Sequence, residues 1–130
     1  MTAVQSNGAA TALIADDDHG VRVQLKAALE HRFQVLEARN GRDALRILAT
    51  LPAPPALAIV DLVMPVMGGL ELIAQLRRLA PHTPIVAITC ESPAAADLLD
   101  VAGCLGASER LTKPVPAAAL AGLADKLLAA

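Results

Sequence analysis

Short apolar runs alternate along the chain with longer segments in which apolar residues recur every three or four positions. A short apolar or alternating run is typical of a strand, and a repeat near 3.6 residues is typical of a helix. On this basis we expect strands over residues 11–15, 33–37, 56–60, 84–89 and 108–111. We expect helices over residues 19–31, 40–51, 70–79, 93–105 and 116–128. Five successive βα units predict an α/β fold, in which a parallel sheet carries helices on both faces.

Polar and proline residues mark the ends of several predicted elements. Asp18 and Asn40 precede helical segments, where a side-chain oxygen can accept a hydrogen bond from an early helical N–H. Three prolines between residues 52 and 55 end the helix that Asn40 begins, because proline cannot continue the helical hydrogen bonds. The predicted strands 56–60 and 84–89 are almost continuously apolar, as expected for strands buried on both faces of a sheet.

The length of 130 residues is the usual size of one domain, which we place at residues 11–130. Residues 1–10 are small and polar and lack a periodic pattern, so we expect a flexible terminal segment. They show no signal-peptide pattern, and the longest nearly apolar run, residues 51–60, is too short to span a membrane. The two cysteines lie far apart in the sequence and do not make a disulfide scaffold, so the expected location is a reducing cytoplasm.

Charge and aromatic content exclude some classes of partner. The formal net charge of −2 offers no basic patch for direct binding of nucleic acid. One Phe, with no Tyr or Trp, excludes base-stacking surfaces and aromatic cages. The candidate chemistry therefore lies among the polar residues that follow the strands.

Polar side chains stand at the carboxyl ends of four predicted strands. Asp16 to Asp18 follow the first strand, and Asp61 follows the third. Thr89 ends the fourth strand, and Lys113 follows the fifth. In a parallel sheet these ends meet at one edge, where α/β proteins bind their ligands.

Clustered carboxylates repel one another, and Mg²⁺, which prefers hard oxygen ligands, relieves that repulsion. A carboxylate can act as a nucleophile and a lysine can neutralise phosphate oxygens, so the set predicts phosphoryl transfer onto an aspartate.

Several of these residues also have a simpler structural interpretation. Aspartates after a strand are common in turns and caps, and Thr89 is a residue type that favours strands. The placement of each group at the end of a different strand is what favours a functional site. We expect Cys90 and Cys104 to be packed inside, and Arg77 and Arg78 to lie on a solvated helix face.

Five segments of the chain, in order, resemble the receiver domain of two-component response regulators. They are LIADDD at 13–18, ARNGRDAL at 38–45, IVDLVMPVMGG at 59–69, PIVAIT at 84–89 and LTKP at 111–114. The resemblance covers about residues 11–128. It implies the flavodoxin-like (βα)5 fold, a doubly wound sandwich whose five-stranded parallel sheet has the strand order 2-1-3-4-5. It also implies a CheY-like, stand-alone response regulator that acts in two-component or phosphorelay signalling.

The resemblance also assigns roles in metal binding and phosphorylation. It implies that Asp61 is the phosphoacceptor. It implies that Mg²⁺ is bound directly by Asp17 and Asp61, and by Asp16 largely through water. The backbone carbonyl of Val63 is implied to be the third direct protein ligand beside Asp17 and Asp61.

Further roles implied by the resemblance concern the phosphoryl group and the partners. Thr89 is implied to hydrogen-bond a phosphoryl oxygen, and Lys113 to pair with Asp61 or its phosphoryl group. The bond between Lys113 and Pro114 is implied to be cis. The implied donor is a histidine kinase or a histidine phosphotransfer protein, and the implied target is a downstream protein that binds a surface formed by the last two helices and the last strand. We expect no binding of nucleic acid and no membrane insertion, and any homodimer is expected to be weak.

Two positions depart from the receiver pattern and keep other hypotheses open. Arg110 stands where receivers usually have Tyr or Phe; it is either an exposed strand residue, which we favour, or a contact for a partner. Val115 stands at another position that is often aromatic. These residues favour a phosphorylation-independent binding module, whereas the complete set of site residues counts against it. A third hypothesis is a phosphatase, but such enzymes usually need a second acid where this chain has Val63. We therefore expect slow autodephosphorylation and no conventional enzymatic turnover.

Overall fold

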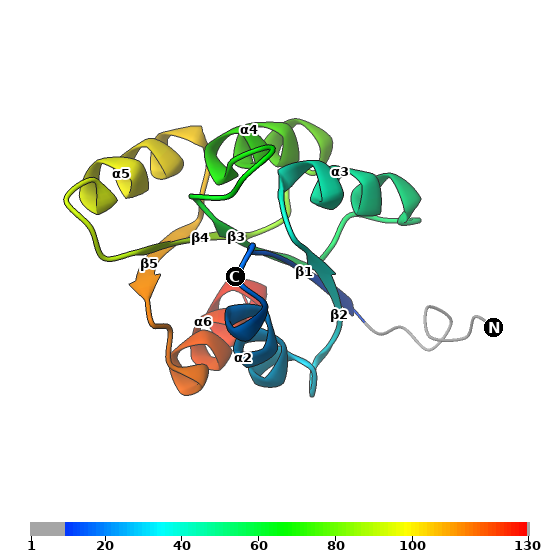
Figure 1. The fold of residues 1–130 in the computed structure, drawn as a ribbon. Helices are drawn as coiled ribbons and strands as arrows, with labels where there is room; N and C mark the ends of the chain where they lie inside the picture. The colour runs from blue at the N-terminus through cyan, green and yellow to red at the C-terminus, as the bar shows by residue number, and fades with distance from the viewer. Residues whose placement is uncertain (1–9, 130) are drawn as a thin grey trace.

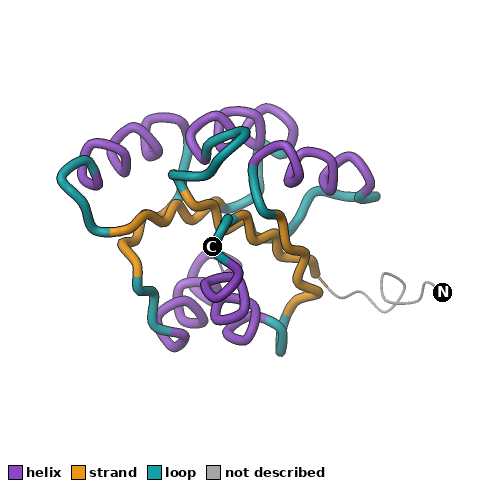
Figure 2. The backbone as a smooth tube through the Cα atoms, in the orientation of Figure 1, coloured by secondary structure: helices purple, strands orange, loops and turns teal. Residues whose placement is uncertain are grey.

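Residues 10–129 are described by the structure, which is a computed structural model. Its strands form one parallel sheet in the order β2-β1-β3-β4-β5, which confirms the predicted topology (Figures 1 and 2). The strands are β1 (Ala10–Ala15), β2 (Phe33–Ala38), β3 (Leu57–Asp61), β4 (Ile85–Cys90) and β5 (Glu109–Lys113). The helices are α2 (His19–Leu29), α3 (Gly41–Thr50), α4 (Gly69–Leu79), α5 (Ala95–Leu105) and α6 (Ala117–Ala129). The flexible segment expected over residues 1–10 lies outside the described residues, apart from Ala10, which begins β1.

Helices enclose the sheet from both sides. Figure 1 shows α3, α4 and α5 on one face and α2 and α6 on the other. Successive side chains of β3 point to opposite faces: Ala58 and Val60 join the core beneath α3 to α5, whereas Leu57 and Ile59 join the core beneath α2 and α6. Because both faces are covered, β3 is apolar along its length until Asp61, as the sequence predicts.

The register of the sheet brings the polar residues to one edge. Ala15 of β1 pairs with Val60 of β3, so the residues that follow, Asp16 and Asp61, are neighbours. The ladder between β4 and β5 ends at Lys113 on the same edge. Parallel pairing alone therefore gathers groups that lie far apart in the sequence.

Both predicted helix caps are present. The side chain of Asp18 accepts a hydrogen bond from the N–H of Val21 at 3.1 Å. The side chain of Asn40 accepts one from the N–H of Asp43 at 2.8 Å. The helix expected from Pro93 begins slightly later, as α5, because a turn precedes its first hydrogen-bonded residue.

Both cysteines are exposed, so the prediction that they are packed inside is wrong. Cys90 is the last residue of β4 and the one exposed residue of that strand. Cys104 follows Ala102, which lies on the buried face of α5, by two residues. Two helical residues differ by about 200° in direction, and Cys104 therefore points to solvent.

Arg77 does not lie on the solvated face predicted for it. Its Nη1 donates to the carbonyl oxygens of Ala80 at 3.3 Å, Pro81 at 2.9 Å and Thr83 at 2.9 Å. Its Nη2 donates to the carbonyl oxygen of Gly106 at 2.6 Å. Carbonyls at helix ends lack helical donors, so one guanidinium satisfies the ends of α4 and α5 together and ties them to the start of β4.

Replacing Arg77 by Met removes these hydrogen bonds and leaves carbonyl groups without donors. We expect Arg77→Met to lower the free energy of unfolding by about 2 kcal/mol. The adjacent Arg78 is exposed and reaches only Gln75, so Arg78→Met should change that free energy by less than about 0.5 kcal/mol. Urea denaturation followed by circular dichroism measures both values. Equal effects of the two substitutions would contradict the role given to Arg77.

Candidate functional site

An acidic cluster formed by Asp16, Asp17 and Asp61 lies at the carboxyl edge of the sheet. One carboxylate oxygen of each residue lies within 4.8 Å of the others. Asp16 and Asp61 are 0% and 3% exposed, whereas Asp17 is open to solvent. The Nζ atom of Lys113 lies 2.8 Å from Oδ2 of Asp16 and 3.4 Å from Oδ2 of Asp61. The structure thus brings together four of the predicted site residues.

Asp16 is fixed by hydrogen bonds from three directions. Its N–H donates to the carbonyl of Ala38 at 3.1 Å, which continues the ladder between β1 and β2. Its Oδ1 accepts from the N–H of Asp18 at 2.9 Å, and its carbonyl accepts from Nη1 of Arg22 at 2.7 Å. These contacts leave Oδ2 directed toward Lys113.

Burial and like charge act together on Asp61. Burial is the larger cause and the charge of Asp16 the next, and together they raise the pKa of Asp61 to about 6. The charge of Lys113 opposes the rise, as does the N–H of Val63, which donates to Oδ1 of Asp61 at 3.3 Å. Burial alone would lower the pKa of Lys113, but hydrogen bonding to Asp16 and the charges of Asp61 and Asp16 outweigh it and raise that pKa. Lys113 therefore remains protonated at neutral pH.

The acidic cluster has the properties of a site for a hard divalent cation. Three carboxylates face a single ammonium, so negative charge is in excess. Oδ2 of Asp16 is buried, and the partner that the structure gives it is the same ammonium of Lys113, at 2.8 Å. Carboxylate oxygens with one side open to water suit Mg²⁺, and the residues therefore fit that ion.

Two other predicted site residues lie at the same edge. Thr89 is buried near the end of β4, one residue beyond Ile88, which is the register partner of Asp61. Val63 follows Asp61 by two residues, and its side chain is 62% exposed. The structure places both residues beside the acidic cluster, whereas the role of the Val63 carbonyl as a metal ligand stays a prediction.

The loop between β3 and α4 turns back tightly over the end of β3. The N–H of Gly69 donates to the carbonyl of Leu62 at 3.2 Å, and a Cβ atom on Gly69 would lie 2.1 Å from the carbonyl oxygen of Asp61. Only glycine permits this approach. Val66, in the same loop, has φ of 70°, which costs a β-branched residue roughly 1–2 kcal/mol. Surrounding contacts, and not local preference, therefore hold the loop beside Asp61.

The two departures from the receiver pattern are visible at the neighbouring surface. Arg110 is exposed, as expected; its guanidinium lies over Gly103 of α5 and 3.7 Å from the carboxylate of Asp100. Val115 follows Pro114, whose peptide bond with Lys113 is cis as predicted. Neither Arg110 nor Val115 belongs to the acidic cluster.

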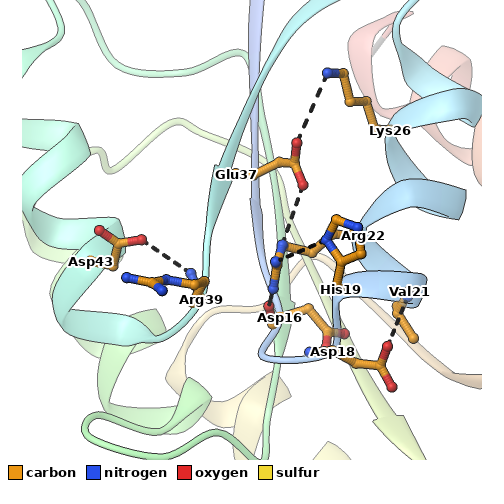
Figure 3. A network of polar contacts seen from close by, with 9 residues as sticks. All are labelled: Asp16, Asp18, His19, Val21, Arg22, Lys26, Glu37, Arg39 and Asp43. Carbon is orange, nitrogen blue, oxygen red and sulfur yellow. Dashed lines mark hydrogen bonds and ion pairs between the residues drawn. The ribbon is translucent and has the colours of Figure 1, made fainter.

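Sequence reasoning missed the network behind Asp16 (Figure 3). Besides the carbonyl of Asp16, Arg22 reaches Oε1 of Glu37 through Nε at 3.2 Å. Its Nη2 lies 3.4 Å from Nδ1 of His19. One signal was available: Arg22 occupies the same face of α2 as Leu25 and other buried residues, where an arginine requires polar partners.

The chain matches the family described as response regulator receiver domain over residues 12–125. The protein named Response regulator MprA from Mycolicibacterium vanbaalenii is 35% identical over 103 residues, which are 78% of this chain and 43% of that protein. Histidine kinase P4 from Formosa agariphila is 37% identical over 84 residues, which are 63% of this chain and 6% of that protein. The chain spans less than half the length of these curated relatives.

Solved structures agree with this family match. The signal receiver domain of a signal transduction histidine kinase from Syntrophus aciditrophicus superposes with a TM-score of 0.81 at 31% identity, covering 93% of this chain and 91% of that one. Within residues 10–129, no helix combines the length and the apolar character needed to cross a bilayer. The match over residues 12–125, together with the acidic cluster at the predicted sheet edge, shows that the chain belongs to the response regulator receiver domain family of two-component signalling proteins.

Proposed function

We propose that Asp61 accepts a phosphoryl group from a phosphohistidine of a histidine kinase or histidine phosphotransfer protein. The observation that carries the proposal is the position of the buried Asp61 carboxylate, which shares the ammonium of Lys113 with the buried Oδ2 of Asp16. Asp17, Asp61 and the backbone carbonyl of Val63 would bind Mg²⁺ directly, and Asp16 would act largely through water. When bound, Mg²⁺ supplies positive charge that stabilises oxygens of the phosphoryl group and of the carboxylates.

The transfer is an in-line substitution at phosphorus. A carboxylate oxygen of Asp61 forms the new O–P bond while the P–N bond to the donor imidazole breaks. The electron pair of the P–N bond stays on the imidazole nitrogen, which takes up a proton from solvent. Lys113 is protonated and lies 3.4 Å from Asp61, so its ammonium stabilises the negative charge that develops on the phosphoryl oxygens.

The phosphoryl group is proposed to change a binding surface through Thr89. This residue lies near the end of β4, directly before the segment that leads into α5. In the proposal its hydroxyl donates a hydrogen bond to a phosphoryl oxygen and draws that segment inward. The affected surface consists of α5, β5 and α6, where Arg110 links β5 to Asp100 of α5.

The proposed setting is two-component signalling in the bacterial cytoplasm. Members of the receiver family interact with histidine kinases and downstream effectors. We propose that this chain acts on a downstream protein, without binding nucleic acid or membrane and with at most weak homodimerisation. A phosphorylation-independent module is not favoured, because Asp16, Asp61 and Lys113 retain the mutual contacts that acceptance of a phosphoryl group requires.

Covalent labelling tests the proposed acceptor directly. Incubation with acetyl phosphate and Mg²⁺ should add one phosphoryl group, seen as an increase in intact mass. Asp61→Ala should abolish the adduct because the nucleophilic oxygen is lost. Asp97→Ala, which removes an exposed aspartate of α5, is the matched control and should be labelled like the wild type. Labelling that persists in Asp61→Ala or in excess chelator would refute the proposal.

The aspartyl phosphate is proposed to hydrolyse slowly, because the side chain of Val63 cannot orient an attacking water. We expect Val63→Asn to shorten the lifetime of the phosphoryl group several-fold, since an amide can hold the water that attacks phosphorus. Val66→Asn changes another exposed valine of the same loop and should leave the lifetime unaltered. A dephosphorylation time course by intact mass compares the three proteins. Equal decay of wild type and Val63→Asn would show that Val63 has no such effect.

A further inference from the structure

We propose that Arg22 is a positioning residue for the acidic cluster, and that Glu37 acts through it. In this proposal the guanidinium fixes the main chain of Asp16, so that the Asp16 carboxylate is presented to Lys113 and to a divalent cation. The inference rests on the proposed function, because it concerns how strongly the same site binds Mg²⁺.

Arg22 is an internal residue and not a solvated surface arginine. It is 8% exposed and belongs to the buried face of α2 together with Leu25, Ala28 and Leu29. A charged side chain at such a position is costly unless its donors are satisfied. Its donors reach groups on three different segments: α2, β2 and the turn after β1 (Figure 3).

The contact with Asp16 is the shortest in this network. Nη1 of Arg22 donates to the Asp16 carbonyl at 2.7 Å. The other two hydrogen bonds that fix Asp16 involve backbone groups of Ala38 and Asp18. Arg22 therefore supplies the one side-chain donor among these three hydrogen bonds, and it links the main chain of Asp16 to Glu37 of β2 and His19 of α2.

Glu37 orients the guanidinium from the neighbouring strand. Its Oε1 lies 3.2 Å from Nε of Arg22, while its Oε2 lies 3.9 Å from Nζ of Lys26. A planar guanidinium with several donors can bind the Glu37 carboxylate and the Asp16 carbonyl together, whereas an ammonium cannot match that geometry.

The contacts of Arg22 with Glu37 and Asp16 are not explained well by a contribution to folding stability alone. A buried ion pair adds little net stability compared with well-packed apolar side chains. Residues that orient metal ligands through hydrogen bonds, in contrast, typically change metal affinity by 10- to 100-fold when they are removed. We therefore expect the main effect of Arg22 on the affinity for Mg²⁺, with a smaller effect on folding.

The test measures the dissociation constant for Mg²⁺ by titration calorimetry and labelling by acetyl phosphate in the full chain. Arg22→Gln should raise the dissociation constant about tenfold or more, and excess Mg²⁺ should restore most of the labelling. Arg22→Lys, which retains charge but loses the planar donors, should recover only part of the affinity. Lys26→Gln is the matched control: Lys26 shares the partner Glu37 but does not contact Asp16, so the affinity should be unchanged.

A double-mutant cycle tests whether Glu37 acts through Arg22. Glu37→Gln should weaken Mg²⁺ binding less than Arg22→Gln does, and the double variant should be no weaker than Arg22→Gln alone. An Arg22→Gln protein that binds Mg²⁺ as tightly as the wild type would overturn the inference, even if it is less stable. If Arg22→Gln does not fold, unchanged Mg²⁺ affinity in Glu37→Gln overturns it. Failure of the wild type to bind Mg²⁺ or to be labelled would instead overturn the proposed function.

Discussion

Mutual repulsion of carboxylates at the carboxyl edge of the sheet is the constraint on which the rest of the structure depends. Asp16 and Asp61 are buried beside Asp17, and the ammonium of Lys113 contacts both buried carboxylates. The arrangement leaves Asp61 with a raised pKa, although the ammonium of Lys113 is close to both buried carboxylates. Such a site attracts a divalent cation and presents a carboxylate to an incoming phosphoryl group.

The apolar scaffold makes this unfavourable arrangement possible. Strands buried on both faces hold Asp16 and Asp61 side by side through backbone pairing, which repulsion between side chains cannot easily disrupt. Gly69 lets the following loop fold back against the end of β3. Arg77 donates to the carbonyl of Thr83, just before β4, and to the carbonyl of Gly106, just after α5, and so connects these two segments. Rigid packing and local hydrogen bonds thus position the acidic cluster.

Most of the fold and the acidic cluster follow from local patterns in the sequence. Asp61 and Lys113 could be placed at one edge because consecutive βα units impose parallel strands, which align their carboxyl ends. Arg77 could not be placed in this way, because its partners are main-chain carbonyls, which carry no residue-specific signal. The position of Arg22 on the buried face of α2 indicated a need for polar partners, but the sequence did not identify the Asp16 carbonyl as one of them. The exposure of Cys90 could not be predicted either, because the five residues that precede it in β4 are all buried.

The most direct test of this account is a carbon-13 NMR titration of the Asp61 carboxyl group in the full chain, with chelator and then with Mg²⁺. Asp61→Asn identifies the signal. The structure predicts an apparent pKa near 6 without metal, because burial and the charge of Asp16 disfavour ionisation, and a lower value with Mg²⁺ bound. Titration of Asp61 near the ordinary value of 3.8 without metal, or a pKa that Mg²⁺ does not lower, would contradict the account.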